Sequence, residues 1–256
     1  MINSNKCYGF IPARYESSRF PGKPLAEIAN KPMFWHVYNR SIQCPYLDQV
    51  YLVTDDNRIY DASLNLEIPV LMTAKHHASG TDRILEACGH LNITGESVIL
   101  NIQGDEPLLH PEMLTQLIDP FEREEVQVST LARQITNPEA ENPNLVKVIF
   151  SHQHKALYFS RSKIPYYAGS SQNPIYWGHV GLYAYKLDVL KRFATLGPSF
   201  LEQTEKLEQL RFLEAGIPIH IQQTTHKSYG VDEPEDLRIV KSILEQEQSD
   251  AGNFGS

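Results

Sequence analysis

Short apolar segments alternate with longer segments of helical periodicity through the first half of the chain. The apolar segments, each bounded by turn-forming residues, are 8–12, 50–54, 97–102 and 126–131. The helical segments that separate or follow them are 32–42, 56–64, 81–90 and 111–121. This alternation predicts an α/β fold with a mostly parallel central sheet and right-handed crossovers.

The rhythm changes in the second half. Strand-like segments are expected at 147–150, 156–159, 179–185 and 217–221, and helices at 187–195, 200–215 and 233–247. The stretch 166–178, rich in Gly, Ser, Asn and Tyr, predicts a loop or lid over a site. Residues 249–256 lack periodicity and predict a disordered tail. Because no repeat or long linker interrupts the pattern, we expect a single domain over residues 1–248.

Composition narrows the class of protein. The 31 acidic and 23 basic side chains give a formal charge of −8, which argues against nucleic acid or an anionic membrane as partner. The three cysteines are far apart and form no metal-binding or disulfide pattern. No apolar segment approaches the ~20 residues of a membrane span, and the N-terminus does not resemble a signal peptide. These features predict a reduced, cytoplasmic protein.

Three cations follow the first predicted strand within ten residues. Arg14, Arg19 and Lys23 lie in the segment IPARYESSRFPGKPL (11–25), which contains one carboxylate, Glu16. Open α/β sheets bind ligands at the carboxyl ends of their strands, and clustered Arg and Lys suit a triphosphate. A solvated surface loop would explain the same charges, and the spacing excludes a P-loop.

Acidic residues follow a second strand and precede the last helix. Asp105 and Glu106 come after segment 97–102, and Asp232 precedes the helix expected at 233–247. Magnesium prefers one or two carboxylates together with water and phosphate oxygens. Asp105 and Asp232 would therefore form a metal site if they are neighbours in space, although turn and helix capping would explain both.

Further polar residues suit ligand recognition. Ser79 and Gly80 open a helix, where backbone amides can bind a nucleotide, but an ordinary N-cap explains the same letters. His179 and Tyr183 lie on one face of a strand, and Arg161 follows an apolar pair. These three side-chain types suit an acid sugar, while each would serve equally well as a structural residue.

Taken together, these segments resemble the 3-deoxy-manno-octulosonate cytidylyltransferase family, whose members activate the acid sugar Kdo as CMP-Kdo. The resemblance covers residues 10 to about 237. It rests on the motifs IPARY (11–15), SRFPGKPL (18–25), SGTDR (79–83), NIQGDEP (101–107), NPN (142–144), VKV (146–148), YFSR (158–161), HVGLY (179–183), LEQLR (207–211) and GVD (230–232).

The resemblance implies a Rossmann-like, glycosyltransferase-A-type nucleotidyltransferase fold that uses CTP and Mg²⁺, releases pyrophosphate and forms a homodimer. Residues 1–135 would form the nucleotide-binding half and residues 136–248 the sugar-binding and dimerisation half. By their match to family motifs, the site residues fall into three groups: Arg14, Arg19 and Lys23 on the triphosphate, with Ala13, Ser79, Gly80 and Gln103 around the nucleotide; Asp105 and Asp232 on the metal; and Gln103, Arg161, His179, Tyr183, Glu208 and Gln209 around the sugar.

The implied reaction is an in-line attack of the anomeric C2 hydroxyl of the sugar on the α-phosphorus. Cations would stabilise the negative charge on the phosphate oxygens, without a covalent enzyme intermediate.

One segment departs from the family pattern. The family has a longer stretch before the His-x-Gly-x-Tyr strand, ending in Arg-His, whereas here Gly178 precedes His179. The segment has lost positive charge and gained tyrosines. Neutral drift explains this, as does a changed substrate such as 8-amino-3,8-dideoxy-manno-octulosonate, whose ammonium would be repelled by an arginine.

Two other functions remain open at this stage. A non-catalytic nucleotide-sugar sensor would have the same fold, although the presence of Lys23, Asp105 and Asp232 argues against it. A nucleotidyltransferase for another sugar is the second, and the motifs at 103–107 and 207–211 favour the Kdo branch instead.

Overall fold

The computed structural model describes residues 6–253 except Ser18, Ala78 and residues 169–173. By its internal contacts the chain forms two compact units, each discontinuous in sequence. One unit comprises Tyr8–Ile93, Asn101–Pro111 and Ser228–Ser256, and we call it the loop unit because it contains the cationic loop. The other comprises Met1–Cys7, Thr94–Leu100 and Glu112–Lys227, and we call it the hairpin unit. The chain returns to the loop unit at residues 101 and 228.

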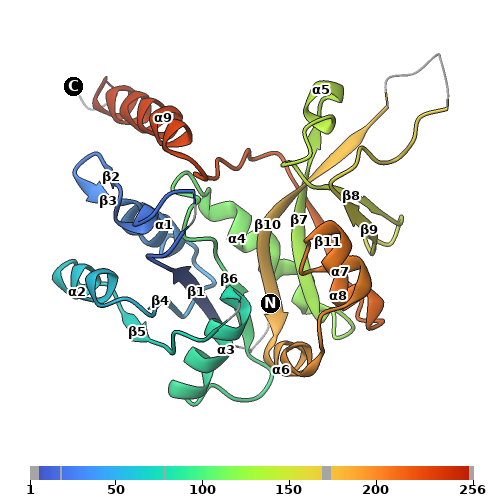
Figure 1. Cartoon of the computed structure of the whole chain (residues 1–256), viewed down its shortest axis with the longest axis horizontal. Coiled ribbons are helices and arrows are strands. Elements are labelled where there is room, and N and C mark those ends of the chain that lie inside the picture. The colour runs from blue at the N-terminus through green and yellow to red at the C-terminus, as the bar shows by residue number, and fades with distance from the viewer. Residues whose placement is uncertain (1–5, 18, 78, 169–173, 254–256) are drawn as a thin grey trace. The chain divides into compact units, whose positions relative to one another are not determined.

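Parallel strands form the sheet of the loop unit (Figure 1). The order is β1 (Cys7–Ala13), β4 (Gln49–Thr54) and β5 (Val70–Met72), with helical crossovers α1 (Met33–Ser41) and α2 (Asn57–Asn65) between them. Phe10, Leu52 and Val53 are fully buried, as expected for strands covered on both faces. The remaining elements of the unit are η1 (Lys23–Leu25), β2 (Glu27–Ile28), β3 (Lys31–Pro32), α3 (Gly80–His90) and α9 (Pro234–Asn253).

A mixed sheet forms the hairpin unit. Its strands run in the order β11 (His220–Thr224), β7 (Val128–Ile135), β10 (Tyr176–Lys186) and β6 (Val98–Asn101). Strand β10 is antiparallel to β7, with a register shift between Val180 and Tyr183, and β11 is parallel to β7. The hairpin of β8 (Lys147–Phe150) and β9 (Ala156–Ser160) joins β10 through β8. The helices are α4 (Pro111–Ile118), η2 (Asp119–Glu122), α5 (Asn137–Ala140), α6 (Leu187–Thr195), α7 (Phe200–Glu205) and α8 (Leu210–Glu214).

The predicted α/β class and the type of most elements are confirmed. Several ends differ by a few residues, among them those of the strands expected at 126–131 and 217–221, and two predictions are wrong. The single helix expected at 200–215 is two helices, because Lys206 adopts a left-handed conformation with φ 55° that ends α7. Helix α9 continues to Asn253, although residues 249–256 were expected to be disordered. No proline follows Pro234 in this helix, and its first glycine is Gly252.

The predicted loop at 166–178 is shorter in the structure, because β10 begins at Tyr176. Residues 169–173 and 254–256 lie outside the described residues, as does Ser18 of the SRFPGKPL motif. Among the helices of the described residues, none combines the length and the apolar character that crossing a membrane requires.

Candidate active site

The cationic loop is closed on itself by backbone contacts. It begins where β1 ends at Ala13, and the amide of Gly22 donates to the carbonyl oxygen of Tyr15 at 2.8 Å. Gly22 has φ 72°, and a Cβ there would lie 3.1 Å from the Tyr15 ring. The closed loop places Lys23 at the first position of η1.

The acidic segment 103–107 lies directly against this loop. The amide of Ile102 donates to the Phe10 carbonyl at 2.8 Å, which continues the pairing up to the loop. At Gly104 a Cβ would lie 2.7 Å from the carbonyl oxygen of Pro12, closer than real Cβ contacts come. Only glycine lets the backbone approach here. The carbonyl of Asp105 in turn accepts from the amide of Val231 at 2.9 Å, which brings the segment before α9 to the same place.

Two cations and two carboxylates meet at this point. Nζ of Lys23 lies 2.6 Å from Oδ2 of Asp105 and 3.7 Å from Oδ1 of Asp232. Nη2 of Arg19 donates to the same Oδ1 of Asp232 at 3.0 Å. The Lys23 side chain is only 15% exposed, whereas that of Asp232 is 54% exposed. Asp105 and Asp232 are therefore neighbours, which was the condition for a shared metal site.

The apolar cluster beneath explains why Asp232 is held there. Val231 is fully buried and packs with Ile28, Met33 and Val240, which come from β2, α1 and α9. Asp236 caps the start of α9 by accepting from the amides of Asp232 and Glu233 at 2.9 Å each. The side chain of Asp232 is thus not needed as a cap and is left to face the cations.

A pocket of about 360 Å³ opens beside this charge cluster. Among its walls are the predicted residues Arg14, Arg19, Lys23, Gly80, Gln103 and Asp105. Ser79 is a different case, because its hydroxyl accepts from the amide of Asp82 in a capping box at the start of α3. The side chain of Ser79 therefore acts as the helix N-cap. The backbone at Gly80, the first residue of α3, still lies beside the pocket.

Glu106 is the buried member of the acidic pair. It is 8% exposed, and burial together with the charge of Asp105 raises its pKa to about 7, opposed by a hydrogen bond from Ser228. Two adjacent carboxylates therefore have different environments, with Asp105 facing the cations and Glu106 facing the interior. Of the two, Asp105 is the one available to a metal ion.

A buried arginine that the sequence analysis did not select as a site residue stabilises the region around Arg14. Arg83 is fully buried, and its guanidinium donates to Asp55 at 2.6 Å and to the hydroxyl of Thr73. Asp55 also lines a smaller cavity of about 180 Å³ together with Arg14 and Lys75. Arg83 thereby fixes one wall of the space that Arg14 borders. In the sequence, Arg83 was marked only by its position in the SGTDR motif (79–83).

The predicted sugar residues, apart from Gln103, lie in the hairpin unit. Nε2 of His179 is 2.9 Å from Oγ1 of Thr130, and its ring contacts those of Phe159 and Tyr183 at centroid distances of 5.0 and 5.4 Å. Burial lowers the pKa of His179 to about 3. Burial and the negative charge of Glu208 raise the pKa of Tyr183 well above its ordinary value. Both side chains are neutral at pH 7.

The side chain of Arg161 binds backbone carbonyl groups. Its guanidinium donates to the carbonyl oxygens of Glu205 at 2.9 Å, Pro143 at 3.2 Å and Lys206 at 3.4 Å. The Glu205 carboxylate accepts from the amide of Arg161 at 2.9 Å and from the hydroxyl of Ser160 at 2.6 Å. This reciprocal pairing fixes the turn that leads to Glu208 and to the buried Gln209. The sequence did not predict this role of Glu205, because its periodicity predicts one continuous helix over residues 200–215.

The approach of Gly104 gives a testable prediction. Gly104→Ala is expected to destabilise the protein by about 1–3 kcal/mol, because the new methyl group must displace the Pro12 carbonyl. The displacement also moves Asp105, so turnover should fall as well. Gly89→Ala is the control, since no atom lies within 4 Å of a Cβ there and the change in α3 should stabilise by ~0.5–1 kcal/mol. Urea unfolding measures both, and equal stabilities of the two variants would contradict the prediction.

The buried imidazole gives a prediction about pH. The pKa of His179 is about 3 in the folded chain and ~6.5 when unfolded, so between these values the unfolded state binds the extra proton. Stability should therefore fall as pH drops from 7 to 5, by ~2 kcal/mol from this group. In His179→Asn the difference in unfolding free energy between pH 7 and pH 5 should shrink by a similar amount. An unchanged difference would show that His179 does not stay neutral in the fold.

The α/β fold is that of a nucleotidyltransferase, with Arg14, Arg19 and Lys23 beside a pocket and with Arg19 and Lys23 against two carboxylates. The cytidylyltransferase family model matches residues 8–224. The 3-deoxy-manno-octulosonate cytidylyltransferase of Nitratidesulfovibrio vulgaris strain Hildenborough is 52% identical over 245 residues, covering 94% of this chain and 96% of that protein. The chain belongs to the 3-deoxy-manno-octulosonate cytidylyltransferase family.

Other similarities agree with this assignment. The 8-amino-3,8-dideoxy-manno-octulosonate cytidylyltransferase of Shewanella pealeana is 45% identical over 237 residues, covering 91% of this chain and 96% of that protein. The structure of a CMP:2-keto-3-deoxy-manno-octonic acid synthetase complexed with CTP superposes with a TM-score of 0.90 at 40% identity, covering 95% of this chain and 100% of that one. The predicted nucleotidyltransferase fold is therefore confirmed.

Proposed function

We propose that this protein transfers CMP from CTP to the anomeric C2 hydroxyl of 3-deoxy-manno-octulosonate and releases pyrophosphate, as a cytoplasmic step of lipopolysaccharide biosynthesis. The observation that carries the proposal is the position of Lys23, 2.6 Å from Asp105 and 3.7 Å from Asp232 beside the 360 Å³ pocket. The names of the relatives and the CTP complex of the similar structure support the choice of nucleotide and sugar.

Magnesium fits the acidic residues of this site. Asp105 and Asp232 offer two carboxylates to one small region that already attracts the ammonium of Lys23, and Mg²⁺ prefers one or two carboxylates plus phosphate oxygens. We therefore propose Asp105 and Asp232 as its ligands. A bound magnesium ion would neutralise triphosphate charge and polarise the phosphoryl oxygens.

The chain's own cations would bind and orient the triphosphate. Arg14 and Arg19 offer planar guanidinium donors for pairs of phosphate oxygens, and Lys23 offers a compact point charge. When an anionic triphosphate enters, Lys23 and Arg19 can exchange their carboxylate partners for phosphate oxygens. Charge stabilisation and alignment of the sugar hydroxyl with the α-phosphorus then lower the barrier without a covalent intermediate.

The hairpin unit would bind the sugar through neutral groups. His179 and Tyr183 are uncharged at pH 7, so they suit the hydroxyls of a sugar ring as hydrogen-bond partners. Arg161, with three carbonyls to hold, acts here by fixing the turn that presents Glu208 and Gln209. We also propose that the protein works as a homodimer, which light scattering of the purified chain would test.

A second acceptor, the 8-amino sugar, is favoured by the packing at Gly178. A Cβ at this position would lie 2.7 Å from Cγ2 of Ile135 and 3.4 Å from Leu145, so no arginine fits here without moving β7 or its neighbours. The chain therefore lacks the positive charge that would repel an ammonium group. The similarity to the Shewanella pealeana protein, which is named for the amino sugar, agrees with this alternative.

The test is pyrophosphate release from CTP and Mg²⁺ with Kdo and 8-amino-Kdo supplied separately at matched concentrations. Preference for Kdo supports the main proposal, and clear preference for the amino sugar assigns Gly178 and its segment to acceptor selection. Replacing CTP by UTP or dTTP should abolish release. Absence of pyrophosphate release with either sugar would overturn the proposal. It would favour the non-catalytic nucleotide-sugar sensor instead, which should still bind CTP.

A further inference from the structure

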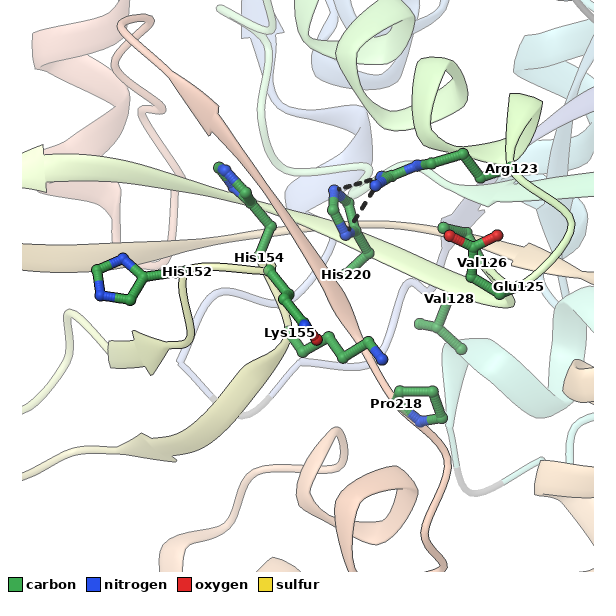
Figure 2. Close-up of a pocket in the computed structure, with 10 residues that line it drawn as sticks. Arg123, Glu125, Val126, Val128, His152, His154, Lys155, Pro218 and His220 are labelled. Carbon is green, nitrogen blue, oxygen red and sulfur yellow. Dashed lines mark hydrogen bonds between the residues drawn. The ribbon is translucent and has the colours of Figure 1, made fainter.

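A second pocket lies in the hairpin unit, and none of its lining residues is predicted for the reaction. It has a volume of about 450 Å³ and is bordered by the segment before β7, the turn between β8 and β9, and the start of β11. Figure 2 shows Arg123 and His220 directed at each other on one wall, with His154 and Lys155 of the turn beside them. A pocket of this volume is in the range that holds small metabolites.

The guanidinium of Arg123 is held at the wall by a buried imidazole. Its Nη2 lies 3.0 Å from Nε2 of His220, which is 7% exposed. Burial, with the positive charge of Arg123 in second place, lowers the pKa of His220 to about 4. The ring is therefore neutral at pH 7 and accepts a hydrogen bond from Arg123, so it orients the arginine without neutralising its charge. The same Nη2 lies 3.4 Å from Nδ1 of this ring, and among the described residues the other guanidinium N–H groups of Arg123 have no hydrogen-bond partner, so they can bind a ligand.

The turn between β8 and β9 supplies the second cation. Lys155 forms a bridge with His220 through the backbone, and its amide donates to Oγ of Ser151. Within the part of the chain that the structure describes, its ammonium group forms no hydrogen bond or ion pair. Glu125 is the one carboxylate among the described lining residues. Two cations against one carboxylate make the pocket locally positive on a chain whose formal charge is −8.

An unusual backbone conformation brings His154 to this place. His154 has φ 59°, a left-handed conformation that glycine adopts far more readily at hairpin turns. Its Nδ1 donates to the carbonyl of Ile221 at 3.2 Å, and its ring lies between Phe150 and His220 at centroid distances of 6.0 and 5.7 Å. These contacts fix the His154 ring at the edge of the pocket.

The pocket is separate from the sugar residues. His220 is in register with Ser129, whose hydroxyl donates to Leu117 of α4, so both point to the helix-covered face of the sheet. None of the residues that line the pocket is among those predicted for the sugar. Arg161 lies at the other end of the β8–β9 hairpin from Lys155, six residues or roughly 20 Å along an extended strand.

We propose that this pocket is a second ligand site that binds a small molecule carrying a phosphate group. The planar guanidinium of Arg123 suits paired phosphate oxygens, and Lys155 adds a point charge from the facing turn. The pocket is larger than a bare phosphate ion needs, so the ligand class is a phosphate monoester with an attached polar body. The site does not depend on the proposed cytidylyl transfer.

A single tryptophan can report binding. Trp177 contacts Phe150 at a centroid distance of 5.3 Å, and Phe150 stacks on His154. The chain has only one other tryptophan, Trp35, so Trp35→Phe leaves Trp177 as the sole emitter. Ribose 5-phosphate is the probe, titrated without Mg²⁺ at constant ionic strength, and ribose is its neutral counterpart. Calorimetry of the unaltered protein gives an independent affinity.

The proposal expects saturable binding of ribose 5-phosphate and none of ribose. Arg123→Gln combined with Lys155→Gln should weaken binding at least 10-fold, while Lys191→Gln, which removes an exposed positive charge from the same unit, and Lys23→Met should each change it less than 2-fold. Cytidylyl transfer should be the same in the double variant as in the unaltered protein. Absence of saturable binding, an equal affinity in the double variant, or a loss in Lys23→Met would each overturn the proposal.

Discussion

Lys23→Met is expected to lower the turnover number for pyrophosphate release by about 10²–10³-fold, the loss seen when one charge-stabilising donor is removed. Methionine preserves the length and most of the apolar stem, so the loss reports the ammonium group. In the structure that group is 15% exposed and lies against Asp105 and Asp232. Such a partly desolvated charge acts on phosphate oxygens more strongly than an exposed lysine would.

The same substitution also has a thermodynamic signature. Without Lys23, Arg19 is the one cation still paired with either of these two carboxylates among the described residues, so the melting temperature should fall in the absence of divalent ions. Added Mg²⁺ should restore most of it if the metal binds both carboxylates. Lys191→Met, an exposed pair with Asp188 at 3.4 Å, is the matched control and should leave turnover and melting unchanged. Turnover within 3-fold of the unaltered enzyme would remove Lys23 from the reaction.

The meeting of Lys23 and Asp105 could be anticipated from sequence because each lies in a segment that follows a strand. Carboxyl ends of parallel strands share one edge of a sheet, so Arg14, Lys23 and Asp105 were expected together. The position of Asp232 was conditional, since no local pattern connects residue 232 with residue 105. The contact that settles it is the backbone hydrogen bond from Val231 to Asp105, supported by apolar packing of Val231.

Features that depend on single backbone conformations could not be anticipated. Periodicity continues through residues 200–215, and only the left-handed conformation of Lys206 separates α7 from α8. Glu205 then becomes the acceptor for Ser160 and Arg161, a role that helical periodicity does not reveal. Gly104 belongs to a motif that the sequence shows. The reason that glycine is needed there is the close approach of its backbone to Pro12, which only the tertiary structure shows. Long-range contacts of this kind have no signal in a single sequence.

In the proposed function the two units would contribute different kinds of chemistry, and their side chains differ accordingly. The loop unit concentrates opposite charges, which suits an anionic triphosphate and a metal ion. The hairpin unit presents neutral, buried His179 and Tyr183, which suit a polyhydroxylated sugar. A charged imidazole beside an anionic acceptor sugar would stabilise the bound sugar before the reaction as much as in the transition state. Such binding would not lower the barrier to the chemical step.

Asp105→Asn should raise the Mg²⁺ concentration for half-maximal activity at least 10-fold and lower turnover by ~10²-fold, because an amide replaces one of two carboxylates in a site for a hard cation. The substitution keeps the size of the side chain and the hydrogen bond from Val231 to the backbone carbonyl, so the fold should persist. Asp232→Asn should have a smaller effect, since this carboxylate is 54% exposed and Arg19 already occupies one oxygen. Asp236→Asn controls for charge loss near the same helix start, because Asp236 caps backbone amides and does not face Lys23. If the Mg²⁺ dependence of Asp105→Asn matched that of Asp236→Asn, the metal would have to be held elsewhere, and the close pair of Lys23 and Asp105 would then serve to position the lysine alone.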